Sequence, residues 1–421
     1  MAIPSVSEEK FRQIIATNLT PSEEIRTPER LFGRIKNLTA IDRALNSPGR
    51  QIFIYGDRGV GKTSLAVTAS YLHTESSSPP IYVPCGRTST FAGVIQAIGK
   101  QTFSVSSRME RAATGRGFNM TLPVVGGIGF SAGTPGGVTI PLPSTVDEAL
   151  DVIKYVAERR SGRLVVVIDE MERIEVVDER DKFAEFIKNI PTLECDVRFI
   201  FCGIGSDINE LLNAHPSAGR ILEAIPLEKL RHDDLWRIIT AANAELNLKI
   251  DLDMLIRISQ ISDGFPHFVH LIGDTMLWSV FDDPQPVTQI GRSHFRAGIT
   301  GALERTEAIL RSQYERAVQK TKNTEDYEET LWAMADTSGY RRQLTEIYDS
   351  SYQRIMRSRT GRKALPKNLF NQRLLSLRKE GHGRAIIGHG AGWFSFRENI
   401  LRGYVRLRAE ERDVELGKDI S

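Results

Sequence analysis

The sequence QIFIYGDRGVGKTSLAVTASYL runs from Gln51 to Leu72 and joins three patterns. The apolar strand pattern QIFIY comes first. The octet Gly56–Thr63 follows and fits G-x-x-x-x-G-K-[ST], and a helical pattern comes last. A P-loop requires this order, because the backbone N–H groups of the loop surround phosphate oxygens and the helix N-terminus adds a positive dipole. The stretch therefore predicts a nucleoside triphosphate site on an α/β domain.

The loop residues are candidate contacts to ATP and Mg²⁺. Lys62 would supply a mobile positive charge for the β- and γ-phosphates, and the Thr63 hydroxyl would bind Mg²⁺. A chance glycine-rich turn before a core helix is the alternative, and the strand before the loop argues against it. The candidate nucleotide contacts in this segment are Gly56, Asp57, Arg58, Gly59, Val60, Gly61, Lys62, Thr63 and Ser64.

A second chemical pattern lies downstream, where the apolar run Leu164–Ile168 ends in Asp169 and Glu170. An apolar strand that ends in two acids is typical of a Walker-B motif. Asp169 would hold Mg²⁺, usually through water, and Glu170 would orient and polarise the attacking water. A solvated strand end is the alternative. After a complete P-loop, the pair favours a Mg²⁺-dependent ATPase.

Strand and helix patterns alternate through the first half of the chain, which predicts a parallel sheet covered on both faces. Residues 112–143 interrupt this alternation, with eight glycines between Gly115 and Gly137. We interpret them as an inserted hairpin or mobile loop, or else as a pore or partner-contacting loop of an oligomer. The expected strands are Gln51–Tyr55, Ile81–Pro84, Leu164–Ile168, Val197–Cys202 and Ala224–Leu227.

Helical patterns dominate after residue 228. Residues 325–408 hold three of them, Tyr327–Ala335, Leu344–Met356 and Lys367–Glu380, followed by two short β-like segments. Helices followed by a two-stranded wing are typical of a winged helix-turn-helix. The expected domains are a polar N-terminal arm (1–30), a nucleotide-binding domain (31–227), a helical lid (228–324), a winged helix (325–408) and a C-terminal tail (409–421).

Charge separates the winged-helix segment from the remainder. Residues 338–408 hold 16 Lys and Arg against 4 Asp and Glu, whereas the other residues hold 39 against 49. A basic module on an acidic chain indicates a polyanion partner, and we expect double-stranded DNA. Protein contacts or solvated arginines are the alternative. The candidate contacts are Arg354, Arg357, Arg359, Arg362, Lys363, Lys367, Arg373, Arg378, Lys379, His382, Arg384 and His389.

Two further polar residues are weaker candidates for catalysis. Ser206 follows the strand Val197–Cys202 and could touch the γ-phosphate or the water. A helix N-cap at Ser206 or Asp207 is the alternative, and both roles are compatible. Arg220 could reach the nucleotide of a neighbouring subunit, or could form a salt bridge on its own surface.

In this order, the motifs resemble those of the AAA+ ATPases, in particular the origin-recognition and replication-initiator branch, and of the related STAND signalling ATPases. Leu31-Phe32-Gly33-Arg34 is similar to their hhGR box, which implies that Phe32, Gly33 and Arg34 lie near the adenine. Gly203-Ile204-Gly205-Ser206-Asp207 resembles the sensor-1 segment, with Ser206 where the initiators usually have Asn. Arg220 falls at the position of the arginine finger.

The lid and the Walker-B segment also resemble these families, with two departures. Gly264-Phe265-Pro266 is similar to the GxP turn of the STAND lid, which makes Pro266 and His267 candidate nucleotide contacts. His267 stands nearest the place of the initiators' sensor-2 arginine. Glu170-Met171-Glu172 stands where family members often have Glu-x-Asp.

Two functions follow as hypotheses. The first is a DNA-associated AAA+ ATPase that assembles through its ATP sites, with Arg220 acting in trans; a transposition regulator belongs to this class. The second is a STAND-like regulatory ATPase, for example a subunit of a bacterial anti-phage defence system, whose winged helix contacts protein and whose partner is an effector. Three cysteines without a C-x-x-C pair, and no membrane-spanning run, favour a cytoplasmic protein.

Overall fold

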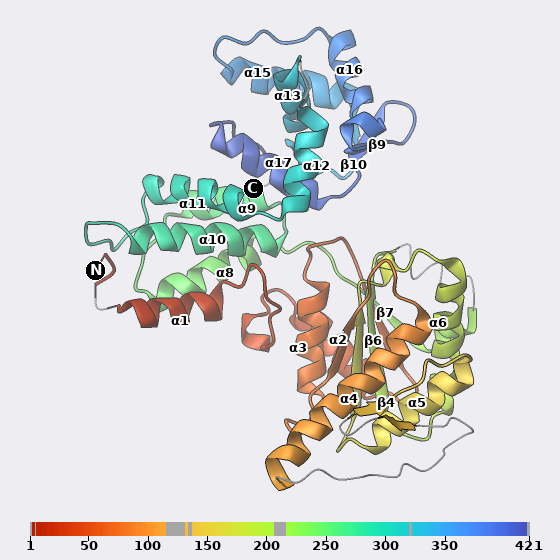
Figure 1. Ribbon diagram of the computed structural model, residues 1–421. Coiled ribbons are helices and arrows are strands. Elements are labelled where there is room, and N and C mark those ends of the chain that lie inside the picture. The colour runs from red at the N-terminus through yellow and green to blue at the C-terminus, as the bar shows by residue number, and fades with distance from the viewer. Residues whose placement is uncertain are drawn as a thin grey trace. The chain divides into compact units, whose positions relative to one another are not determined.

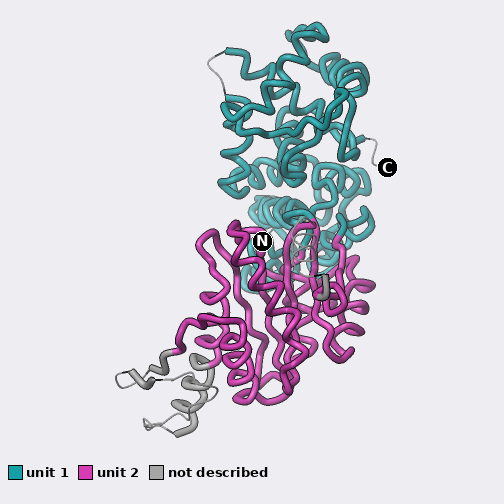
Figure 2. The backbone as a smooth tube through the Cα atoms, turned by 90° about the vertical axis from the view of Figure 1, so that its right-hand side faces the viewer, with its two compact units in different colours: residues 1–23, 57–61, 228–421 teal, residues 24–56, 62–227 magenta. Residues whose placement is uncertain are grey.

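The computed structural model describes residues 2–4, 6–114, 131–133, 137–205, 216–319 and 322–418. The chain forms two compact units (Figure 2). Unit 1 holds Met1–Glu23, Asp57–Gly61 and Glu228–Ser421, and unit 2 holds Glu24–Gly56 and Lys62–Leu227. None of the described helices is long and apolar enough to cross a membrane.

Unit 2 is built on a parallel five-stranded sheet in the order β2-β5-β6-β1-β7. Helices α4, α5 and α6 cover one face, and α2 and α3 cover the other (Figure 1). This arrangement confirms the predicted α/β fold of a P-loop NTPase. The strands are β1 (Gln51–Tyr55), β2 (Ile81–Pro84), β5 (Leu164–Asp169), β6 (Val197–Gly203) and β7 (Leu222–Pro226).

The described residues of unit 2 form five α-helices. They are α2 (Ile35–Leu45), α3 (Lys62–Leu72), α4 (Phe91–Thr114), α5 (Val146–Glu158) and α6 (Val177–Asn189). Every residue of β5 is buried, as expected for a central strand packed on both sides. Within the glycine-rich segment 112–143, β3 (Ser131–Gly133) pairs antiparallel with β4 (Gly137–Thr139).

The first part of unit 1 is a helical bundle of α1 (Glu8–Asn18), α8 (His232–Glu245), α9 (Leu252–Ser262), α10 (Pro266–Phe281) and α11 (Arg292–Arg305). Helix α1 lies in the segment that we expected to be a polar arm. Ser7 caps its N-terminus, and Phe11 is fully buried against the rings of Trp278 and Phe281. Burial of one apolar face therefore attaches this segment to α10.

The last part of unit 1 follows α12 (Ala308–Val318). It contains α13 (Thr324–Ala335), α14 (Leu344–Glu346), α15 (Gln353–Ser358), α16 (Lys367–Ser376), α17 (Ile400–Glu411) and a sheet of β8 (Arg342–Gln343), β10 (Trp393–Phe396) and β9 (Ile386–Gly388). The predicted helix Leu344–Met356 is not uniform, because Ile347–Tyr352 is π-helical. Strand β8 was not predicted, because two residues are too few to show a period.

Candidate nucleotide site

The P-loop joins β1 to α3 through a glycine-dependent backbone. Gly59 and Gly61 have φ angles of +83° and +97°, a region that L side chains rarely adopt. Helix α3 begins at Lys62, so the first N–H groups of this helix have no intrahelical partner. The Lys62 side chain is buried, and its Nζ donates to the Gly56 carbonyl at 3.0 Å. An ammonium group fixed at the mouth of such a loop suits phosphate binding.

The acid at the end of β5 lies beside the hydroxyl of the P-loop. Asp169 is 1% exposed, and its Oδ2 accepts hydrogen bonds from Thr63 Oγ1 at 2.5 Å and from Tyr82 Oη at 3.0 Å. The backbone N–H of Glu170 donates to Oδ1 at 2.8 Å. Three donors compensate the desolvation of this carboxylate. A hydroxyl and a carboxylate are oxygen ligands suited to Mg²⁺, which keeps waters and phosphate oxygens as its other ligands.

Tyr82 is a site residue that the sequence analysis missed. It projects from β2, whose register sets Tyr82 beside Val167 on β5, two residues before Asp169. Burial, together with the charge of Asp169, raises the pKa of the Tyr82 hydroxyl far above its ordinary value, so the group remains a donor. The available signal was the strand alternation, which buries Ile81 and Val83 and points Tyr82 to the other face.

Glu170 has an unusual backbone conformation for its residue type. Its φ and ψ of 57° and 40° lie in the left-handed region. Its carboxylate pairs with Arg173 at 3.0 Å, a partner that the sequence analysis did not single out. A non-glycine residue held in a sparsely populated region at the end of a core strand is an outlier of the kind found at functional sites.

The residues before α2 connect to α3 within unit 2. The Ile25 N–H donates to Ser64 Oγ at 3.2 Å, and Thr68 Oγ1 donates to the Ile25 carbonyl at 2.7 Å. Ser64, a predicted nucleotide contact, thus supports the 24–34 segment. Within this segment, Gly33 has a φ of +71° and Arg34 is buried at the start of α2.

The other predicted site residues are dispersed. Ser206 lies outside the described residues. Arg220 ends the short 3₁₀ helix Pro216–Arg220 and is exposed. In unit 1, Pro266 is the first residue of α10. His267 follows, with Nδ1 3.2 Å from the Pro21 carbonyl, and burial lowers its pKa.

The parallel sheet and the P-loop with its neighbouring acid define a P-loop NTPase. Residues 31–271, more than half of the chain, match the family described as an ATPase domain predominantly from Archaea. The chain belongs to this family and is an enzyme that hydrolyses ATP. No curated protein sequence matches it significantly.

Solved structures support the same fold. The Walker-type ATPase of Pyrococcus abyssi is similar to the chain with a TM-score of 0.53 and 14% identity, over 91% of this chain and 99% of that one. The ORC2 protein of Aeropyrum pernix, solved as ADPNP and ADP complexes, has a TM-score of 0.50 and 13% identity, over 95% of this chain and 98% of its own. At these identities the likeness concerns the fold alone.

Proposed function

We propose that this ATPase binds double-stranded DNA through residues 338–408 and that residues 325–408 form a winged helix. We further propose that subunits assemble through their ATP sites with Arg220 acting in trans. In each site, Lys62 contacts the phosphates, Thr63 and Asp169 hold Mg²⁺, and Glu170 orients the attacking water. The observation that carries the proposal of DNA binding is a set of basic side chains around α16 that form no ion pair among the described residues. The order of α13, α16 and the antiparallel β9–β10 hairpin supports a winged helix.

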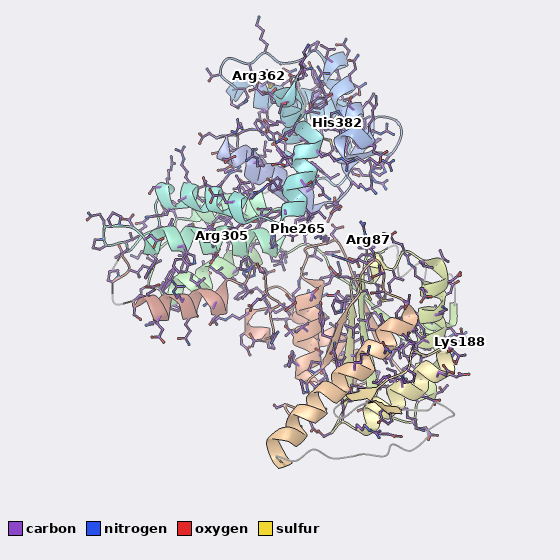
Figure 3. All side chains as sticks on the ribbon, viewed as in Figure 1. Arg87, Lys188, Phe265, Arg305, Arg362 and His382 are labelled. Atoms are coloured by element: carbon purple, nitrogen blue, oxygen red, sulfur yellow. The ribbon has the colours of Figure 1, made fainter. Side chains whose placement is uncertain are left out.

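Much of the positive charge in this region is neutralised internally, contrary to our expectation for the DNA-contact set. Acidic side chains of α13 pair with three of the predicted contacts: Arg359 with Glu329 at 3.4 Å, Arg373 with Asp326 at 3.2 Å, and Arg362 with both acids at 2.9 and 3.0 Å (Arg362 is labelled in Figure 3). These arginines attach α16 and the loop before it to α13.

Other predicted contacts have partners too. Arg354 pairs with Asp336, Lys367 with Asp349 and Arg384 with Glu380, and His382 Nδ1 lies 2.7 Å from the Ala317 carbonyl. The exposed basic side chains with no ion pair among the described residues are Arg341, Arg357, Lys363, Arg378, Lys379 and Arg397. Such side chains suit phosphate contacts, which give affinity and salt dependence with little sequence information.

The DNA half is tested with Lys363→Gln/Lys379→Gln. We expect weaker binding to every duplex, measured by fluorescence anisotropy between about 50 and 200 mM salt. The magnitude of the slope of the logarithm of the binding constant against the logarithm of the salt concentration should fall by about 1 for each lysine that no longer neutralises a phosphate. Lys188→Gln, which removes an exposed lysine of α6 in unit 2, is the control and should bind as the wild type does (Figure 3). Absence of DNA binding by the wild type at low salt, with and without ATP, would refute the proposal.

A second function, that of a regulatory switch, is favoured by contacts within unit 1. Asn399, which precedes α17, donates from Nδ2 to Asp57 Oδ2 at 3.0 Å. Arg58 pairs with Glu307 at 2.9 Å and with Glu398 at 3.8 Å. A Cβ built on Gly59 would lie 2.6 Å from Ile400 Cδ1. The residues that lead into α17 therefore contact Asp57, Arg58 and Gly59, and these contacts would slow nucleotide exchange.

The switch is tested with Asn399→Ala. We expect release of a fluorescent ADP analogue to accelerate about threefold to tenfold, because one partly buried hydrogen bond is removed. Stopped-flow fluorescence measures this rate, and Glu380→Gln, which alters an exposed acid paired with Arg384, is the control. Unchanged release would mean that the contact does not restrain the loop. Co-purification of a stoichiometric effector, with ATPase activity indifferent to DNA, would favour this function over the first.

A further inference from the structure

Helix α16 has two faces of different chemistry. Its inner face carries Phe370 and Leu374, which are fully buried. Figure 1 shows the helix beside α13 and near the β9–β10 hairpin. The opposite face carries Asn368, Asn371, Gln372 and Leu375, which follow the i, i+3, i+4, i+7 spacing of one helical stripe. Asn371 is half-buried and the other three are exposed.

The three carboxamides on this stripe are not used by the fold. Among the described residues, none of their side chains has a hydrogen-bond partner. The charged residues of the same helix, in contrast, form ion pairs with other parts of the chain: Arg373 pairs with Asp326 and Lys367 with Asp349. The outward surface of α16 is therefore an uncharged row of donors and acceptors with one apolar residue, Leu375, which is 38% exposed.

Carboxamides match the edge of one base in particular. The amide of Asn or Gln donates and accepts side by side, which pairs it with N7 and the N6 amino group of adenine in the major groove. An apolar side chain suits the methyl group of thymine. An α-helix with its side chains is about 10–12 Å across, which suits the roughly 12 Å width of the major groove.

Basic side chains flank this stripe at both ends. Lys363 precedes α16, and Arg378 and Lys379 follow it; all three are exposed and have no ion pair within the described part of the chain. Phosphate contacts at the two ends of a helix fix its register in the groove, whereas the uncharged centre contacts the bases. This charge pattern is complementary to a duplex, in which the bases lie between two rows of phosphates.

We propose that Asn368, Asn371 and Gln372 read adenine bases directly in the major groove, so that the chain prefers A·T-containing sites. This inference rests on the DNA-binding function proposed above and adds sequence specificity to it. The basic residues account for affinity, and the carboxamides account for the difference in affinity between sites.

The test begins with selection from a randomised duplex library by the full chain with ATP, followed by anisotropy titration on the selected duplex and on a scrambled one. We expect an A·T-containing consensus. Asn371→Ala and Gln372→Ala should each lower affinity for the selected duplex about tenfold and leave affinity for the scrambled duplex unchanged. Lys363→Gln/Lys379→Gln should lower both affinities by the same factor. Circular dichroism of each variant checks that the chain remains folded.

The outcomes separate the two proposals. A wild type that binds neither duplex overturns the DNA-binding function and this inference with it. A wild type that binds both duplexes equally overturns the inference and leaves DNA binding intact. A sequence preference that survives Asn371→Ala and Gln372→Ala also overturns the inference, because the preference must then come from other residues or from the shape of the DNA.

Discussion

Glu170→Gln is expected to bind ATP normally and to hydrolyse it about 10²–10⁴-fold more slowly, the range that a positioned general base contributes. Glutamine keeps the size of the side chain and removes its ability to accept a proton. In the structure the Glu170 carboxylate pairs with Arg173, and its backbone is held in the left-handed region. Single-turnover hydrolysis of labelled ATP, together with retention of ATP on a filter, separates the chemical step from binding.

Two further variants show whether the loss of hydrolysis is specific to Glu170. Lys62→Ala removes the ammonium group at the P-loop and should lower nucleotide affinity itself, because the phosphates then lack a charge-assisted donor. Glu175→Gln alters an exposed acid near the same segment and should hydrolyse ATP at the wild-type rate. If Glu170→Gln hydrolysed ATP as fast as Glu175→Gln, another group would orient the water, and the pair with Arg173 would be structural only.

The strands and the first half of the site were predictable because they depend on local sequence. A strand buried on both faces is a continuous apolar run, so Leu164–Ile168 was placed within one residue of β5. Parallel strands bring their carboxyl ends to one edge of the sheet, which explains why Asp169, at the end of β5, lies near Thr63. The loop between β1 and α3 could also be predicted from sequence, because its backbone needs glycines at positive φ.

Other features of the fold and of the site could not be predicted, because they depend on contacts between residues far apart in sequence. A count of charges could not show that Arg362 is neutralised by Glu329, 33 residues earlier, nor that Tyr82 donates to Asp169, 87 residues later. Helix α1 was not predicted for a different reason. Phe11, Ile14 and Ile15 have helical spacing, but the acids Glu8 and Glu9 gave the segment a polar appearance.

Asp263→Asn is expected to destabilise unit 1 by about 3–5 kcal/mol, the usual cost of breaking a buried ion pair from one side. Asp263 is 5% exposed and contacts three cations: Lys229 at 2.5 Å, Arg402 at 2.7 Å and Arg406 at 3.3 Å. Burial opposes ionisation of this carboxyl, but Arg406, Arg402 and Lys229 outweigh burial, and its pKa lies below the ordinary value. Asparagine tolerates the left-handed conformation at this position, so the variant removes the charge and keeps the backbone.

The network joins parts of unit 1 that are distant in sequence, so its disruption should be cooperative. Arg406 also donates to the Ala335 and Gln260 carbonyls, at 2.7 and 2.6 Å, which links α17 to the ends of α13 and α9. All four tryptophans lie in unit 1, so urea unfolding followed by tryptophan fluorescence reports this unit alone. Asp413→Asn, which breaks an exposed pair with Arg296, is the control and should cost no more than about 1 kcal/mol. Equal midpoints for the two variants would show that the buried cations are stabilised by backbone carbonyls without Asp263.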